Sequence, residues 1–265
     1  MDEAARTVVV ETARAHARDY YLSALLAPRK VRDDLLVLAA FEGELQRIPE
    51  SVSEPLLVEI RLQWWRDWIA SFTPEARTGN LVADALADVA VRRGLHRADL
   101  LASVDARVPD EELETQLPIP GARRRLASLD AAAMARAATV LGARPDAQQS
   151  ASIAVAGLAY SLARRAVTTR SGLGKMDTPN SGLVLNLKSE LQMARRNLGD
   201  LQEHLRRWPK PLRLAVLPVA LVEPYLRACE KGRVDGAAPP IRADDAMVPL
   251  IRVWRLWRFA STGHL

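Results

Sequence analysis

The chain has 265 residues, of which 49% are hydrophobic and 26% charged, with a formal net charge of +5. This hydrophobic content is normal for a protein with a buried core, and no run of 18 apolar residues is present that could span a membrane. The single cysteine, Cys229, excludes an intrachain disulfide and a cysteine-based zinc site, which favours a reducing compartment. The basic excess suits phosphate groups, acidic partners or lipid heads, although a solvated arginine-rich surface explains most of it. No recognition motif supports nucleic-acid binding, so we expect no nucleic-acid partner.

Ala and Leu dominate the sequence and no long alternating run is present, so we predict an all-α protein. The predicted helices cover residues 3–26, 31–47, 56–71, 80–94, 98–106, 122–141, 147–169, 183–207, 212–229 and 248–261. We expect a break between Pro49 and Pro55, kinks at Pro218 and Pro224, and irregular segments over 109–121, 170–182 and 232–245. No repeat or domain-sized linker is evident, which predicts a single domain over residues 1–265.

Four segments resemble, in the same order, elements of the squalene/phytoene synthase family. Residues 19–29 (DYYLSALLAPR) resemble its opening helix, and residues 32–41 (RDDLLVLAAF) its R-x-x-L-x-A-L-Y-A-F helix. Residues 101–107 (LASVDAR) are similar to its L-I-D-A-R element, and residues 156–162 (AGLAYSL) to the start of its second-motif helix. The resemblance implies an isoprenoid synthase-like multi-helix bundle around a central cavity. In the family's enzymes, two D-x-x-x-D motifs hold Mg²⁺ ions that bind the substrate's diphosphate.

A further segment resembles one branch of this family. Residues 52–55 (VSEP), followed by residues 59–67 (EIRLQWWRD), are similar to the branch that contains the mitochondrial complex I assembly factor and its α-proteobacterial relatives. Residues 217–220 and 224–226 fit the same branch. Because that assembly factor is thought to be non-catalytic, the resemblance implies a protein client rather than a prenyl substrate.

The acidic residues of the metal motifs are largely missing at the matching positions. Counting from Phe41, the first motif falls on Gln46 and Glu50, with Glu42 and Glu44 expected on other faces of the helix. The second motif falls on a stretch without Asp or Glu, residues 151–176, where Arg164, Arg165 and Thr168 stand in its place. Arginine offers no oxygen ligand to a hard cation, so we expect no metal site and no catalytic residues. Asp200 and Glu203 could form a substitute site, but pairing with Arg196, Arg206 or Arg207 is the favoured interpretation.

The remaining candidate residues concern ligand binding. By resemblance, an anion or diphosphate would be bound by Arg32, Arg61, Arg107 and Arg164, and the cavity would be lined by Tyr20, Phe41, Trp64 and Tyr160. Helical geometry sends one of the adjacent Arg164 and Arg165 to solvent. Trp64 and Trp68 share a face, while Trp65 points about 100° away, so core packing explains at least one of them.

The last predicted helix mixes tryptophan with arginine: Arg252, Trp254, Arg255, Trp257 and Arg258. This mixture suits a membrane interface or an acidic partner surface. The alternative is an amphipathic helix whose tryptophans dock on the core.

Three functions follow from these residues. The leading hypothesis is a pseudoenzyme that acts by binding, as an assembly factor for a complex I-like respiratory complex. It would need no cofactor, and would work in the cytoplasm or mitochondrial matrix, peripherally at the inner membrane face. The first alternative is an active prenyltransferase acting on prenyl diphosphates with Mg²⁺ in a rebuilt site. The second alternative is a carrier that binds a prenyl or lipid ligand through arginine.

Overall fold

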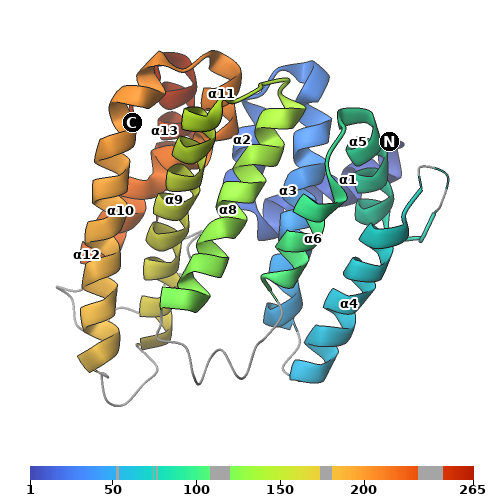
Figure 1. The fold of residues 1–265 in the computed structure, drawn as a ribbon, viewed down its shortest axis with the longest axis horizontal. Coiled ribbons are helices and arrows are strands. Elements are labelled where there is room, and N and C mark those ends of the chain that lie inside the picture. Colours follow the sequence, from blue (N-terminus) through green and yellow to red (C-terminus); the bar gives the residue numbers. More distant parts are fainter. Residues whose placement is uncertain (52–53, 74, 76, 108–119, 174–180, 232–246) are drawn as a thin grey trace. The chain divides into compact units, whose positions relative to one another are not determined.

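The computed structural model describes residues 1–265 except 52–53, 74, 76, 108–119, 174–180 and 232–246. The side chains at positions 49–50, 55, 120–128, 165, 168–173, 181–191 and 231 also lie outside the description, which includes Glu50, Arg165 and Thr168. Every regular element in the described part is helical, which confirms the all-α prediction (Figure 1). The chain divides into two compact units, Met1–Arg144 and Pro145–Leu265. The single domain expected from the sequence stays a prediction.

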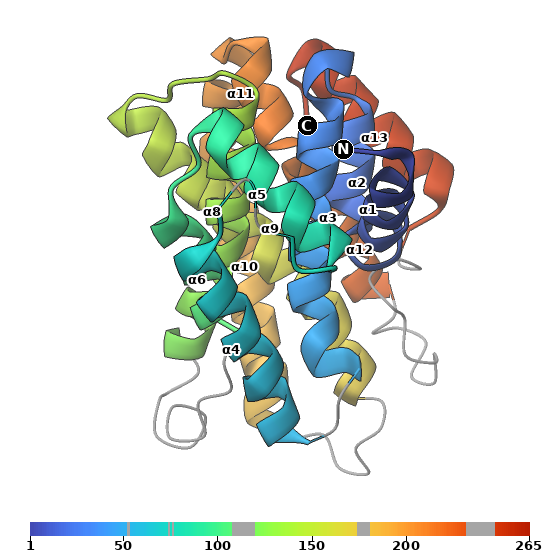
Figure 2. The ribbon, with the colours of Figure 1, turned by 90° about the vertical axis from the view of Figure 1, so that its right-hand side faces the viewer.

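The N-terminal unit is organised around one helix, α3, which contacts most of the others. Its apolar run from Leu35 to Phe41 is buried on almost every face, so neighbouring helices pack on it from several sides. The helices of this unit are α1 (Glu3–His16), α2 (Arg18–Leu25), α3 (Arg29–Ser51), α4 (Pro55–Ser71), α5 (Leu81–Arg93), α6 (Arg97–Asp105) and α8 (Pro120–Val140). Figure 2 shows α1, α2 and α5 grouped about α3.

The first predicted helix, residues 3–26, is wrong as one continuous helix because the chain bends at Ala17 between α1 and α2. The bend allows both pieces to pack on α3, where Gly43 permits the close approach. A Cβ atom at Gly43 would lie 3.1 Å from the Cβ atom of His16 and 3.3 Å from the carbonyl oxygen of Thr12. Tertiary packing therefore decides this bend, which helix propensity alone does not predict.

The predicted end of the second helix at residue 47 is also wrong, because α3 continues through Pro49 to Ser51. Proline removes one backbone hydrogen bond from a helix, and the loss is smaller when it falls in the last turn. Gln46 and Glu50 therefore belong to one helix.

The C-terminal unit contains α9 (Ala147–Leu173), α10 (Ser181–Arg207), α11 (Lys210–Ala215), the 3₁₀ helix η1 (Leu217–Leu221), α12 (Val222–Lys231) and α13 (Pro249–Thr262). Helix α9 is its centre, because fully buried alanines, Ala156, Ala159, Ala163 and Ala166, let α10 and α12 pack close to its backbone. The Sγ atom of Cys229 on α12 lies 3.7 Å from the carbonyl oxygen of Ala166.

The helix predicted over residues 212–229 is not continuous. Kinks were expected at Pro218 and Pro224, but the chain forms separate helices there. Pro218 lies in η1 and Pro224 in the first turn of α12, so three short helices replace the single one. The expected irregular segment over 170–182 is shorter than predicted, since α9 extends to Leu173 and α10 starts at Ser181. Most of the segments expected over 109–121 and 232–245 lie outside the described residues.

Candidate functional site

The first-motif face of α3 carries one fully enclosed carboxylate, Glu42. It lies one turn before Gln46 on the same face, because residues four apart align along a helix. The expectation that Glu42 points elsewhere is therefore wrong. Gln46 itself is half-buried and has polar contacts, and the side chain of Glu50 is outside the description.

Two arginines from other helices hold the Glu42 carboxylate. Oε2 accepts a hydrogen bond of 2.7 Å from Arg107 Nη2 next to the end of α6, and Oε1 accepts one of 2.5 Å from Arg136 Nη2 on α8. Arg136 also donates to the Ser103 hydroxyl at 2.8 Å and to the Asp99 carbonyl oxygen at 2.8 Å. We call these three charged residues, Glu42, Arg107 and Arg136, the Glu42 cluster.

The electrostatics of the Glu42 cluster favour the ionised acid. Burial alone would raise the pKa of Glu42, but the charges of Arg107 and Arg136 and their hydrogen bonds outweigh it and lower the pKa below its ordinary value of 4.5. Glu42 is thus an anion bound to two cations inside the protein. Arg107 was a candidate ligand for a diphosphate, and its described partners are Glu42 and the Ser103 carbonyl oxygen, at 2.8 Å.

The second-motif face of α9 contains no Asp or Glu between Ala147 and Leu173. Tyr160 is fully buried, with its ring centroid 6.4 Å from that of Tyr225 on α12. Arg164, one turn later, is half-buried and has polar contacts. Within the described residues, no three His, Cys, Asp or Glu side chains lie together in a way that could hold a metal ion.

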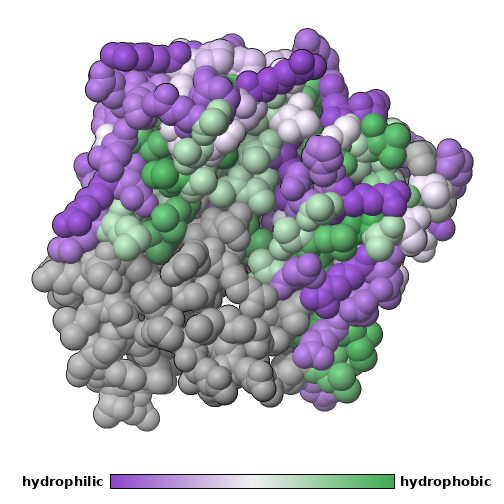
Figure 3. Space-filling model, viewed as in Figure 1, coloured by the Kyte–Doolittle hydropathy of each residue, from purple (hydrophilic) through white to green (hydrophobic). Residues whose placement is uncertain are grey.

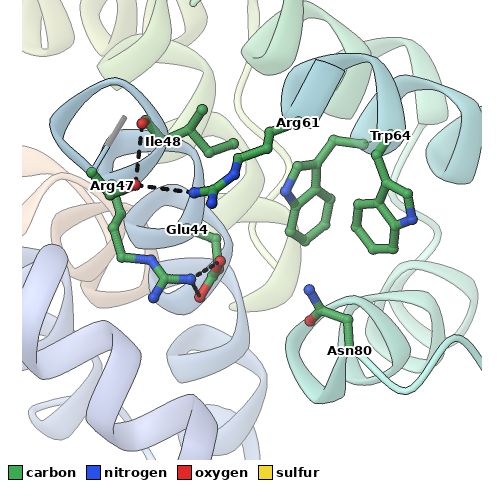
Figure 4. Close-up of a pocket in the computed structure, with 8 residues that line it drawn as sticks. Glu44, Arg47, Ile48, Arg61, Trp64 and Asn80 are labelled. Carbon is green, nitrogen blue, oxygen red and sulfur yellow. Dashed lines mark hydrogen bonds and ion pairs between the residues drawn. The ribbon is translucent and has the colours of Figure 1, made fainter. Parts of the chain in front are cut away.

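Two candidates from the sequence, Arg61 and Trp64, meet at a surface pocket of about 440 Å³ in the N-terminal unit. Both come from α4, and α3 forms the opposite wall (Figure 4). Arg61 donates to the Ser51 hydroxyl at 3.1 Å. Across the pocket, Arg47 makes two hydrogen bonds of 2.9 and 3.1 Å to Glu44 on its own helix.

The pocket combines hydrogen-bond donors with aromatic surface. The side-chain oxygen of Asn80 caps α5 by accepting from the backbone N–H groups of Val82 and Ala83, so its NH₂ group remains to face the pocket. Trp65 is buried, whereas Trp64 is partly exposed and stacks on Trp68 with 6.4 Å between ring centroids. The sequence expectation that core packing explains at least one of these tryptophans is confirmed for Trp65 and Trp68.

The exposed side of α4 extends this pocket with apolar side chains. Leu56, Leu57 and Ile60 are exposed on the same helix. Figure 3 shows hydrophobic surface at the lower right, where Figure 1 places the first turns of α4. An apolar strip therefore leads to the Arg61 guanidinium group.

Three other predicted ligand residues take part in packing. The Tyr20 hydroxyl donates to Asp130 Oδ1 at 2.5 Å, linking α2 to α8. Phe41 is fully buried and packs edge-on against Trp65, with 5.3 Å between ring centroids. Arg32 donates to the Ala27 carbonyl oxygen at 3.2 Å at the start of α3.

The predicted surface on the last helix requires one correction. Arg252 is fully buried, with its guanidinium carbon 5.8 Å from the Tyr225 ring centroid, so its inclusion in a contact surface is wrong. It occupies the same side of α13 as Leu256 and Phe259, which pack into the unit. Trp254 and Trp257 are about half exposed, and neither is docked on the core. No helix in the described part of the chain is long and apolar enough to cross a membrane.

Comparisons with known proteins show which proteins this all-helical chain is similar to. Residues 13–115 match the model of the squalene/phytoene synthase family. The fold is similar to the crystal structure of squalene synthase HpnC from Alicyclobacillus acidocaldarius, with a TM-score of 0.65 over 89% of this chain and 95% of that chain. The sequence identity of this pair is 15%, so the likeness shows the fold alone. These matches support the resemblance to the squalene/phytoene synthase family that the sequence indicates, over residues 13–115 in sequence and over most of the chain in fold.

One relative is similar in sequence over about a third of the chain. This is the NADH dehydrogenase (ubiquinone) complex I, assembly factor 6, of Homo sapiens, at 33% identity over 92 residues. The match covers 34% of this chain and 28% of the human protein.

Proposed function

We propose that this protein is a catalytically silent member of the family that acts by binding, in the assembly of a complex I-like respiratory complex. The observation that carries the proposal is the depletion of carboxylates at the motif positions, where Glu50 is the one acid that remains. On α3, Gln46 replaces an acid and Glu42 is bound by two arginines. On α9 there is no acid at all.

Ionisation of a diphosphate requires strong charge stabilisation at the leaving oxygen, which the family's enzymes obtain from bridging metal ions. A carboxylate that already neutralises Arg107 and Arg136 is a poor metal ligand, because binding a cation would leave two buried arginines without their counterion. The name of the human relative supports a client in a respiratory complex.

The pocket beside Arg61 supports binding of a peptide segment of the client. Its guanidinium and Asn80 amide groups can donate to a carboxylate, while Trp64 and the strip of Leu57 and Ile60 can cover an apolar neighbour. The proposed ligand is therefore an acidic side chain next to apolar residues.

The chemical half of this proposal is tested with purified protein. Farnesyl and geranylgeranyl diphosphate, with Mg²⁺ or Mn²⁺, are expected to release no more pyrophosphate than a control without protein. An active squalene synthase assayed in parallel shows that the assay works. Pyrophosphate release well above the control that stops with EDTA would refute catalytic silence.

The binding half is tested in host cells that lack the gene. We expect less assembled NADH dehydrogenase complex on native gels, with recovery by the wild-type protein and by Gln46→Ala. An Arg61→Gln, Trp64→Ser variant should fail to restore assembly, while Arg66→Gln on the same helix should restore it. Unchanged complex levels in the deletion strain would overturn the assembly role, and full recovery by the pocket variant would overturn the site.

A further inference from the structure

Helix α13 has two apolar faces, and only one of them is buried. Leu256, Phe259 and Ala260 pack into the C-terminal unit. On the opposite side, Leu250, Val253, Trp254 and Trp257 are 80%, 43%, 49% and 55% exposed. We call these four residues the α13 stripe.

The spacing of the α13 stripe is that of a single helical face. Its members stand at positions i, i+3, i+4 and i+7, which align along a helix with 3.6 residues per turn. Figure 2 shows α13 as one continuous helix over this region. Scattered exposed apolar residues are normal on a protein surface, but a contiguous row of large ones, including two tryptophans, marks an interaction site.

The charge next to the α13 stripe is positive. The guanidinium carbons of Arg255 and Arg258 lie 5.9 and 5.3 Å from the Trp254 ring centroid, which places both cations beside the exposed indole. No Asp or Glu occurs between Met247 and Leu265. Burial and the neighbouring Arg227 and Arg258 charges lower the pKa of Arg255, although Glu223 on α12 partly offsets them, so these arginines repel one another and would gain from an approaching anion.

We infer that the α13 stripe docks on the anionic surface of a lipid bilayer, with Trp254 and Trp257 at the interface and Arg255 and Arg258 near the lipid phosphates. Tryptophan favours the boundary between hydrocarbon and headgroups, and arginine binds phosphate oxygens. This inference concerns a different surface from the pocket and does not depend on catalytic silence.

Vesicle flotation tests the apolar part of the inference with the full chain. We expect binding to vesicles of 70% phosphatidylcholine and 30% phosphatidylglycerol, and much weaker binding to pure phosphatidylcholine. The variant Trp254→Ser, Trp257→Ser should bind the anionic vesicles at least about tenfold less. The matched control is Val91→Ser on α5 with Met193→Ser on α10, which removes apolar side chains that are 55% and 50% exposed and should bind like wild type. Circular dichroism checks folding, and Leu250→Ser, Val253→Ser provides a second stripe variant.

The contribution of charge is tested by vesicle flotation of Arg258→Gln. The control is Arg207→Gln, which removes an exposed arginine from α10. One cation near an anionic bilayer should change the partition coefficient about fivefold at low salt, and the difference should shrink at high salt. Equal flotation of wild type and both stripe variants would overturn the inference, as would equal binding to neutral and anionic vesicles. Sedimentation showing a wild-type dimer that the stripe variants convert to monomers, without vesicle binding, would instead assign the stripe to a second copy of the chain.

Discussion

Two sites, one in each unit of the protein, use arginine in opposite ways. In the N-terminal unit, Arg107 and Arg136 are bound to the buried carboxylate of Glu42. In the C-terminal unit, Arg255 and Arg258 lie beside the exposed Trp254, with no acid on their own helix. The first arrangement fixes helices to one another, and the second leaves positive charge at the surface.

The composition of a helix therefore does not decide what its cations do. A buried ion pair costs desolvation and repays it only when its hydrogen bonds are complete, as around Glu42. Asp34 on α3 has a similar role, since Arg92 and Arg93 of α5 contact it at 2.8 and 2.7 Å. Such arginines stabilise the fold and are poorly placed to bind a ligand.

The largest effect is expected from breaking the Glu42 cluster. Glu42→Gln leaves two buried guanidinium groups without their counterion, which should cost about 3–5 kcal/mol of the free energy of unfolding. Urea denaturation of the wild type and the variant at neutral pH measures this difference in unfolding free energy. A loss below about 1 kcal/mol would mean that solvent reaches these arginines.

Acid should weaken the same cluster. Because folding lowers the pKa of Glu42, its contribution to stability is complete above the ordinary value of 4.5 and is lost as the pH falls through the lower folded value. The difference in unfolding free energy between wild type and Glu42→Gln should therefore shrink on acidification below about pH 4.5. A difference that is constant from pH 7 to pH 3 would show that Glu42 does not titrate differently in the folded protein.

A smaller loss of stability is expected from substitutions at two helix ends, one in each unit. Gly94 ends α5 and Gly263 ends α13, both with positive φ, at 66° and 73°. An added Cβ meets nothing within 4 Å at Gly94, but lies 3.2 Å from the Arg206 Cα atom at Gly263. Gly94→Ala should cost about 1 kcal/mol for the backbone conformation, and Gly263→Ala more. Thermal unfolding of the two variants shows which one loses more stability. A larger loss for Gly94→Ala than for Gly263→Ala would contradict the packing of α13.

The smallest effect is expected at an exposed pair. Glu203 and Arg207 on α10 lie 2.8 Å apart with side chains 75% and 77% exposed, which confirms the pairing expected for Glu203. Glu203→Gln should change the unfolding free energy by no more than about 0.5 kcal/mol. The variant also serves as the matched control for Glu42→Gln, since both remove one charge from one carboxylate.

Most of the helices and the family were predictable from local patterns. Apolar periodicity, prolines and glycines are read within one helix, so the bounds of α4, α5 and α10 agree with the sequence prediction to within two residues. The prediction was wrong at Ala17, where packing on α3 bends the chain against its helix propensity. It was also wrong at Pro49, because the last turn of a helix tolerates a proline.

The residues alone were enough to predict an all-α protein whose metal-motif positions keep one acid, Glu50, because a residue's identity limits the ligands that it can offer. Only the tertiary structure decided that Glu42 binds Arg107 and Arg136, which lie 65 and 94 residues away along the chain. It also decided that Arg252 is buried while Trp254 and Trp257 are exposed. Each position on a helix is turned about 100° from the last, so which side faces solvent depends on what the helix packs against.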